Sequence, residues 1–256
     1  MYSFQDLPGN ILIALAVNFI IGFASYKAKL VDKSGLWSGI VVGVLVFVGF
    51  GWEGFVLLFT FFLAGSLASK FKMKTKSKMG VAQKKGGQRG LAHVFANTAV
   101  PAVCALVAIL AEPPDRPVYF IAFAAALATA LGDTISTELG QLYGKRTYLL
   151  ITLERVRPGT EGAVSAEGTA LGFGASILLA LAAFGVHPFP GAFGIKAVAI
   201  VALAAMMANF IESILGGLYH QFGKESPETL MKLRQHGHRR AARRRVGVVV
   251  VFRFSG

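Results

Sequence analysis

The sequence has few charged residues and only one cysteine. Asp, Glu, Lys and Arg make up 15% of its 256 residues, whereas a soluble globular domain carries roughly 25%. Cys104 has no second thiol with which to pair, so an internal disulfide is excluded and a small buried hydrophobe is the plain interpretation. The N-terminal stretch "MYSFQDLPGN" contains no basic residue. We therefore expect no cleavable signal peptide, and we expect the first apolar segment to stay in the membrane.

Long apolar runs fill most of the chain. Hydrophobic residues make up 54% of the sequence, and its mean hydropathy is +0.59. We therefore predict an all-α fold, a polytopic membrane helix bundle of about seven transmembrane helices with basic cytoplasmic loops. The second and third spans are short, which suits a tilted or re-entrant hairpin. The predicted spans are 10–26, 37–50, 54–69, 91–111, 118–142, 164–185 and 194–219.

The net charge of +13 follows an alternating pattern along the chain. All Lys and Arg residues except Arg116 and Lys196 fall in every second connection or in the C-terminal tail. The positive-inside rule then places the N-terminus outside and the basic loops, with any site they carry, on the cytoplasmic side. The basic residues are thus explained as topology signals, and we expect no nucleic-acid partner.

One span, in "ALATALGDTISTELGQLYGKR", contains carboxylates within an apolar run. At 100° per residue, Asp133, Ser136 and Thr137 share one face of a helix, and Thr134 and Glu138 lie in the adjoining sector. Ionisable residues inside a membrane bundle either pair with one another or line a water-filled cavity. The plainer alternative is that the two acids only pair with basic side chains.

A later helix repeats this arrangement. Setting "DTISTELGQLY" over "NFIESILGGLY" brings Asn209, Glu212 and Ser213 to positions that match polar residues of the first helix. Both helices run toward the cytoplasmic side, and their glycines allow close approach. The two polar faces would then form an acidic pocket open to the cytoplasm. Oxygen ligands of this kind suit Mg²⁺ rather than zinc.

The loop between these helices is basic and rich in glycine. Glycines on either side of a threonine let backbone N–H groups wrap an anion just before a helix begins, and arginines supply bidentate donors to phosphate. A tight turn with topology-setting charges is the plainer alternative. The G-x-x-x-x-G-K-[ST] pattern of a P-loop is absent from the sequence. The candidate phosphate-binding residues here are Lys145, Arg155, Arg157, Pro158, Gly159, Thr160, Glu161, Gly162 and Ser165.

A second glycine-containing segment, "KKGGQRGLAHVFANTAVPA", leads into the fourth span. Arg89 and Asn97 are candidates for phosphate contact there, whereas His93 is better explained as a packing or interfacial residue. The Lys-rich run 70–85 before it is interpreted as a solvated linker attracted to anionic lipid.

These motifs resemble the integral-membrane family of phytyl-phosphate kinases. "ATALGDTISTELG", "YLLITLERVRPGTEGAVSAEGT", "GGQRGLAHVFANTAVPA" and "NFIESILGG" are similar to its marked segments, over about residues 30–220. More distantly, the arrangement is similar to that of dolichol and phytol kinases and CDP-diacylglycerol synthases. Ala163 and Glu212 depart from the expected glycine and aspartate. The matching residues are Asp133, Thr134, Glu138, Pro158, Gly159, Thr160, Gly162, Val164, Ser165, Gly168, Glu212, Ser213 and Gly216.

The resemblance implies a Mg²⁺-dependent kinase in a cell or photosynthetic membrane. It would transfer a phosphoryl group from a nucleoside triphosphate, CTP more than ATP, to a prenyl monophosphate such as phytyl or geranylgeranyl phosphate. Asp133, Glu138 and Glu212 would hold the metal, and Asp133, Glu138, Lys145, Arg155 and Arg157 would form the catalytic group. The sequence is also compatible with a homodimer. Two alternatives remain at this point, a cytidylyltransferase that forms a CDP-lipid and a membrane transporter.

The C-terminal part departs most from the family pattern. We predict a transmembrane catalytic domain over 1–222 and a basic cytoplasmic tail over 223–256. The family leads us to expect a further apolar span after residue 230, but "VGVVVVF" is too short to cross a membrane as a helix.

Overall fold

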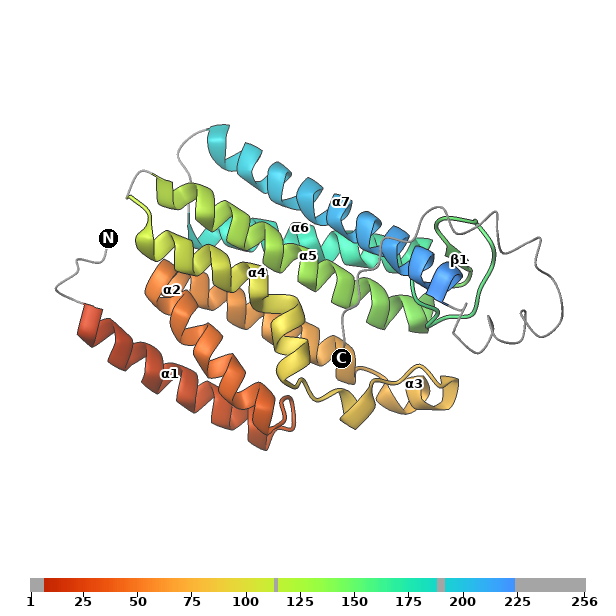
Figure 1. Cartoon of the computed structure of the whole chain (residues 1–256), viewed down its shortest axis with the longest axis horizontal. Helices are drawn as coiled ribbons and strands as arrows, with labels where there is room; N and C mark the ends of the chain where they lie inside the picture. The colour runs from red at the N-terminus through yellow and green to blue at the C-terminus, as the bar shows by residue number, and fades with distance from the viewer. Residues whose placement is uncertain (1–6, 113–114, 188–191, 224–256) are drawn as a thin grey trace, which may run out of the picture.

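The protein is a bundle of long helices (Figure 1). A computed structural model of the chain describes residues 7–112, 115–187 and 192–223. The predicted basic tail 223–256 therefore lies almost wholly outside the described residues. In chain order the elements are α1 (Leu7–Lys27), α2 (Lys33–Lys70), α3 (Met73–Met79), a 3-10 turn (Lys84–Gly87), α4 (Leu91–Leu110), α5 (Arg116–Tyr143), β1 (Thr147–Leu149), β2 (Ala163–Ser165), α6 (Ala166–Val186) and α7 (Ala192–Gly223).

The long helices form where the sequence is continuously apolar. Within the described residues, five helices are long and apolar enough to cross a membrane, namely α2, α4, α5, α6 and α7. Large apolar side chains cover their outer faces, with Leu110 79% and Ile195 75% exposed. Exposed apolar surface on this scale is suited to lipid rather than to water. The prediction of an all-α polytopic membrane bundle is thus confirmed.

Helix α2 contains two of the predicted spans and reverses direction between them. Gly51 has φ 64° and ψ −152°, a backbone conformation that is open almost only to glycine. The Nζ of Lys70, at the end of α2, donates a hydrogen bond of 2.9 Å to the carbonyl of Ala28, which precedes its start. Both ends of α2 therefore lie on one side of the bundle with Gly51 far from them, which confirms the predicted hairpin of 37–50 and 54–69.

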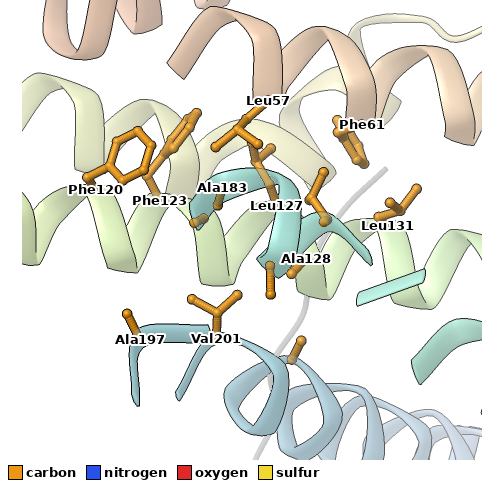
Figure 2. Close-up of a cluster of buried hydrophobic side chains, with 14 of the residues drawn as sticks. Leu57, Phe61, Phe120, Phe123, Leu127, Ala128, Leu131, Ala183, Ala197 and Val201 are labelled. Atoms are coloured by element: carbon orange, nitrogen blue, oxygen red, sulfur yellow. The ribbon is translucent and has the colours of Figure 1, made fainter. Parts of the chain in front are cut away.

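Helix α5 forms the centre of the bundle. It packs against α2, α4, α6 and α7. Leu57 and Phe61 of α2 meet the row formed by Phe123, Leu127 and Leu131 on α5, as Figure 2 shows. On the other side, Val201 of α7 joins the same buried cluster. This packing fixes the axis and rotation of α5, and so fixes where its polar residues point.

The short elements gather at one end of the bundle. Figure 1 shows α3 and β1 at the end where α5 and α7 finish. Strands β1 and β2 pair antiparallel, with Thr147 opposite Ser165, and thus draw the two ends of the loop after α5 together. The side chain of Ser165 then caps α6 by accepting a hydrogen bond of 3.1 Å from the Gly168 N–H. The basic loop is consequently held against the ends of α5 and α7.

Candidate active site between helices α5, α6 and α7

A cavity of about 310 Å³ lies where α5, α6, α7 and the loop after α5 meet. Its wall combines carboxylates, hydroxyls, an amide and glycines from segments far apart in the sequence. The wall includes residues of α5 and α7, the two helices that are predicted to share a polar pocket, together with the glycine-rich part of the loop. The wall includes Asp133, Ser136, Thr137, Gly159, Thr160, Glu161, Gly162, Ser165, Asn209, Glu212 and Ser213.

The polar face of α5 supplies one side of this cavity. Asp133, Ser136 and Thr137 line it together, as expected for residues at i, i+3 and i+4 of a helix. The Thr137 hydroxyl lies 3.5 Å from the Asp133 carboxylate and donates to it. Thr134 is buried on another side, where its hydroxyl donates to the Ala130 carbonyl at 2.8 Å. Thr134 is predicted to bind phosphate, but it does not line this cavity.

Helix α7 supplies the opposite side. Asn209, Glu212 and Ser213 line the cavity, which places the two matching polar helices around one space. The Ser213 hydroxyl donates to the Asn209 backbone carbonyl at 2.9 Å. The side-chain Oδ1 of Asn209 is buried and has no hydrogen-bond partner among the described residues. A buried acceptor without a donor is costly, which makes this oxygen a candidate for contact with a ligand of the cavity.

The loop closes the third side through two glycines with positive φ. Gly159 has φ 86° and Gly162 has φ 71°. A Cβ at Gly162 would lie 2.0 Å from the backbone nitrogen of Gly217, so the loop touches the α7 backbone directly. The Thr160 N–H and hydroxyl both donate to the Arg157 carbonyl, at 3.2 and 2.8 Å. Thr160 thus shapes the turn, and its amide is already engaged.

Glu138 lies outside the cavity, which corrects its predicted place beside Asp133 and Glu212. Its side chain is 2% exposed and accepts hydrogen bonds from Lys76 Nζ and Gln83 Nε2. Five residues turn a helix by about 500°, so Asp133 and Glu138 point roughly 140° apart. In this structure Glu138 forms a buried ion pair with Lys76 and is not placed to share a metal with Asp133.

The same contact corrects the interpretation of 70–85 as a solvated linker. Residues 73–79 form α3, and Lys76 is fully buried. Lys76 Nζ also donates to the carbonyls of Ala68 and Ser69, at 2.9 and 3.3 Å. Lys76 and Gln83 are the structural residues that sequence reasoning missed. Nothing in a run of alternating lysines distinguishes the one that is buried from those in water.

The basic loop residues are exposed and do not line the cavity. Lys145, Arg155 and Arg157 are all solvent-exposed, on the same loop as the cavity wall. Pro158, beside Gly159, is also outside the wall. Their long side chains can reach toward a highly charged ligand that projects from the cavity.

Arg89 and Asn97 lie in a second cavity, apart from Asp133. This space of about 100 Å³ lies between α1, α2 and α4 and also contacts His93. The Nδ2 of Asn97 donates to the His93 carbonyl at 2.8 Å. Burial lowers the pKa of Arg89 to about 10, while the charge of Glu138 acts in the opposite direction. The predicted phosphate-binding residues are thus divided between two sites.

The oxygen atoms of the first cavity fit Mg²⁺. Asp133 and Glu212 bring two carboxylates, and the unpartnered Asn209 Oδ1 adds a neutral oxygen. Within the described residues there is no cluster of three or more His, Cys, Asp or Glu side chains that could hold a metal. Mg²⁺ commonly binds through one or two carboxylates, with substrate phosphates and waters completing its octahedron. The donor set therefore matches a metal that arrives with a phosphate ligand.

The fold and the cavity define a multi-pass integral membrane protein with a polar site at one end of its bundle. Residues 16–249 match the family described as integral membrane protein DUF92, and the chain belongs to that family. The family resemblance drawn from the motifs is thereby confirmed. No solved structure matches the chain significantly.

Relatives in a cyanobacterium and a plant are similar over most of the chain. An uncharacterized membrane protein of Synechocystis sp. is 35% identical, over 83% of this chain and 81% of that protein. Protein VTE6, chloroplastic, of Arabidopsis thaliana is 37% identical over 83% of this chain, which spans 62% of the length of that relative. Protein PGR of Arabidopsis thaliana is 30% identical, over 81% of this chain and 78% of that protein.

Proposed function

We propose that this protein is a membrane-embedded kinase that phosphorylates a prenyl monophosphate. The observation that carries the proposal is the cavity itself, in which the carboxylates of Asp133 and Glu212 share a wall with a glycine-rich turn, and the loop that forms this turn also carries exposed basic side chains. The family membership and the similarity to protein VTE6 support the same reaction class. A nucleoside triphosphate, CTP before ATP, is the proposed donor, and the diphosphate is the product.

Phosphoryl transfer needs positioning and charge compensation more than covalent chemistry. Asp133, Glu212 and the Asn209 amide oxygen would hold Mg²⁺, which when bound neutralises charge on the triphosphate. Lys145, Arg155 and Arg157 would reach over the rim to the phosphate oxygens of donor and acceptor. The acceptor phosphate already carries an ionised oxygen, so attack on the terminal phosphorus needs no general base.

The apolar part of the cavity suits a lipid acceptor. Phe173, Met206 and Phe210 line the same space as the carboxylates, and Phe210 is 38% exposed on the outer face of the bundle. A chain that entered from the membrane would pass these side chains and bring its phosphate to Asp133. This arrangement explains why a kinase for such a substrate is built from membrane helices.

We further propose that the basic end of the bundle faces the cytoplasm. The loop after α5 and the segment 70–90 around α3 lie at this end with the end of α7, and these two segments contain 12 of the 17 Lys and Arg residues of the described chain. The positive-inside rule then orients the cavity toward cytoplasmic nucleotide. A homodimer is compatible with this arrangement.

Purified protein incubated with labelled CTP or ATP, Mg²⁺ and phytyl or geranylgeranyl phosphate tests the proposal. A prenyl diphosphate with a nucleoside diphosphate is the expected product pair. A CDP-lipid with pyrophosphate would instead identify a cytidylyltransferase. Absence of turnover with every lipid phosphate would contradict both enzymes and favour a transporter.

A further inference from the structure

The cavity between α1, α2 and α4 is a separate space with apolar walls. No described residue lines both cavities, and α5 contributes nothing to the wall of this one. Most of its wall consists of aliphatic and aromatic side chains, including Ile21, Leu58 and Phe62. Three of its polar residues, Arg89, His93 and Asn97, follow one another along the start of α4, with Arg89 at the end of this row. The space thus has apolar walls and a cationic residue at one end, which is the pattern of a site for an acidic amphiphile.

Arg89 is held rigidly at this end. Its N–H donates to the Leu30 carbonyl at 2.9 Å, and its own carbonyl accepts from the Asp32 N–H at 3.1 Å. The guanidinium stands 5.3 Å from the centre of the Phe61 ring. A Cβ at Gly65 would lie 2.2 Å from Nη2, so the absence of a side chain there makes room for the guanidinium.

The guanidinium has unused donors although it is buried. Arg89 is 3% exposed, and its Nε and Nη2 have no hydrogen-bond partner among the described residues. Leaving charged donors unsatisfied in the interior is costly, because they lose water and gain nothing in return. Nε and Nη2 are also the pair of nitrogens through which arginine can donate two parallel hydrogen bonds to one phosphate.

The neighbouring carboxylates are already engaged. Glu138 is paired with Lys76 and also accepts from Gln83. Asp32 pairs with Lys85 at 2.9 Å and accepts from the Ser34 hydroxyl at 2.6 Å. The buried group formed by Lys76, Glu138 and Arg89 therefore carries one positive charge in excess. An anion in the cavity would compensate it.

We propose that this cavity binds a single-chain membrane lipid with a phosphate monoester head, held by the guanidinium of Arg89. The chain would lie along the apolar wall formed by α1, α2 and α4. A space of about 100 Å³ has room for the head group and the first carbons of one chain but not for two chains, so the rest of the chain would extend from the cavity into the bilayer. The site is distinct from the transfer cavity, because no described residue lines both. That the lipid bound here is a second molecule of the acceptor rests on the proposed function.

Photolabelling without nucleotide or metal tests this site. The probe is geranylgeranyl phosphate with a diazirine in its chain, added to full-length protein in detergent, and the labelled peptides are mapped. We expect adducts on α1, α2 and α4 that fall at least about tenfold in Arg89→Gln, since two charge-assisted hydrogen bonds are lost. Arg116→Gln is the matched control, because Arg116 begins α5 and lines neither cavity. Equal labelling of Arg89→Gln and the unchanged protein would overturn the proposal.

Competition in the unchanged protein keeps the test independent of how Arg89→Gln folds. Phytyl phosphate should displace the probe from α4 peptides, and phytol should not. Equal displacement by phytol would refute the phosphate contact, equal displacement by inorganic phosphate would refute the lipid, and stronger displacement by two-chain phosphatidate would refute the single chain. Asp133→Asn should retain α4 labelling while it loses kinase activity. If the unchanged protein were labelled on α4 but showed no kinase activity, the proposed function would be rejected and the proposed lipid site would stand.

Discussion

Lys76 and Glu138, 62 residues apart in the sequence, form an ion pair in which both side chains are almost completely buried. The pair joins α3 to α5, and Lys76 also holds the last carbonyls of α2. A charged pair in the interior stays favourable only while both members are present, because either one alone is a buried charge without compensation.

Replacing Lys76 by Met should therefore lower stability strongly. Removal of one member of a buried pair costs about 3–5 kcal/mol, and the double change Lys76→Met with Glu138→Leu should recover most of the loss. Thermal unfolding in detergent, followed by circular dichroism, measures the effect. Lys74→Met on the exposed part of α3 is the control. Additive losses in the double variant would contradict a direct pair.

Asp133→Asn should reduce kinase activity by at least about 100-fold while the melting temperature changes little. The exchange keeps the size of the side chain and removes the charge proposed to hold the metal, and loss of one such electrostatic contact costs about this much in rate. Thr129→Val provides a matched change on the same helix, because Thr129 only donates to the Ala125 carbonyl and lies outside the cavity. Full activity of Asp133→Asn would show that the Asp133 carboxylate does not hold the metal.

Gly162→Ala should abolish activity without unfolding the bundle. The added Cβ would meet the Gly217 backbone, and φ at this residue is unfavourable for alanine. The loop would have to leave α7, which opens the cavity wall. Gly174→Ala on α6 is the control, since a Cβ there meets nothing within 4 Å. If Gly162→Ala turned over prenyl phosphate normally, the loop contact would have no part in the reaction.

Asp32 should make the protein less stable in acid. Hydrogen bonds from Ser34, the Gly35 N–H and Lys85 hold the pKa of Asp32 well below its usual range. A depressed folded-state pKa gives stability that is present above the unfolded pKa of about 3.9 and is lost as pH falls toward the folded value. Melting temperatures of the unchanged protein and Asp32→Asn should thus differ clearly at pH 6, and the difference should shrink steadily as pH falls below about 4. A constant difference would show that the charge of Asp32 is irrelevant.

The sequence predicts those parts of the fold that follow from periodicity. Apolar runs located the spans, and the 100° rotation per residue grouped Asp133 with Ser136 and Thr137 on the face that lines the cavity. The same rotation could not decide what Glu138 contacts, because its partner Lys76 belongs to a segment without periodicity. The predicted phosphate-binding residues lie in two cavities because of how α4 packs relative to α7. No local sequence pattern encodes the position of one helix relative to the other.

The reversal at Gly51 also affects how the chain can be inserted into a membrane. Because both ends of α2 lie on one side, this element adds two crossings at once and leaves the orientation of everything that follows unchanged. Helices α4 to α7, which carry the transfer cavity, would therefore keep their sidedness whether the hairpin enters early, late or not at all. The parity of the topology is thus protected at the described helix that reverses direction.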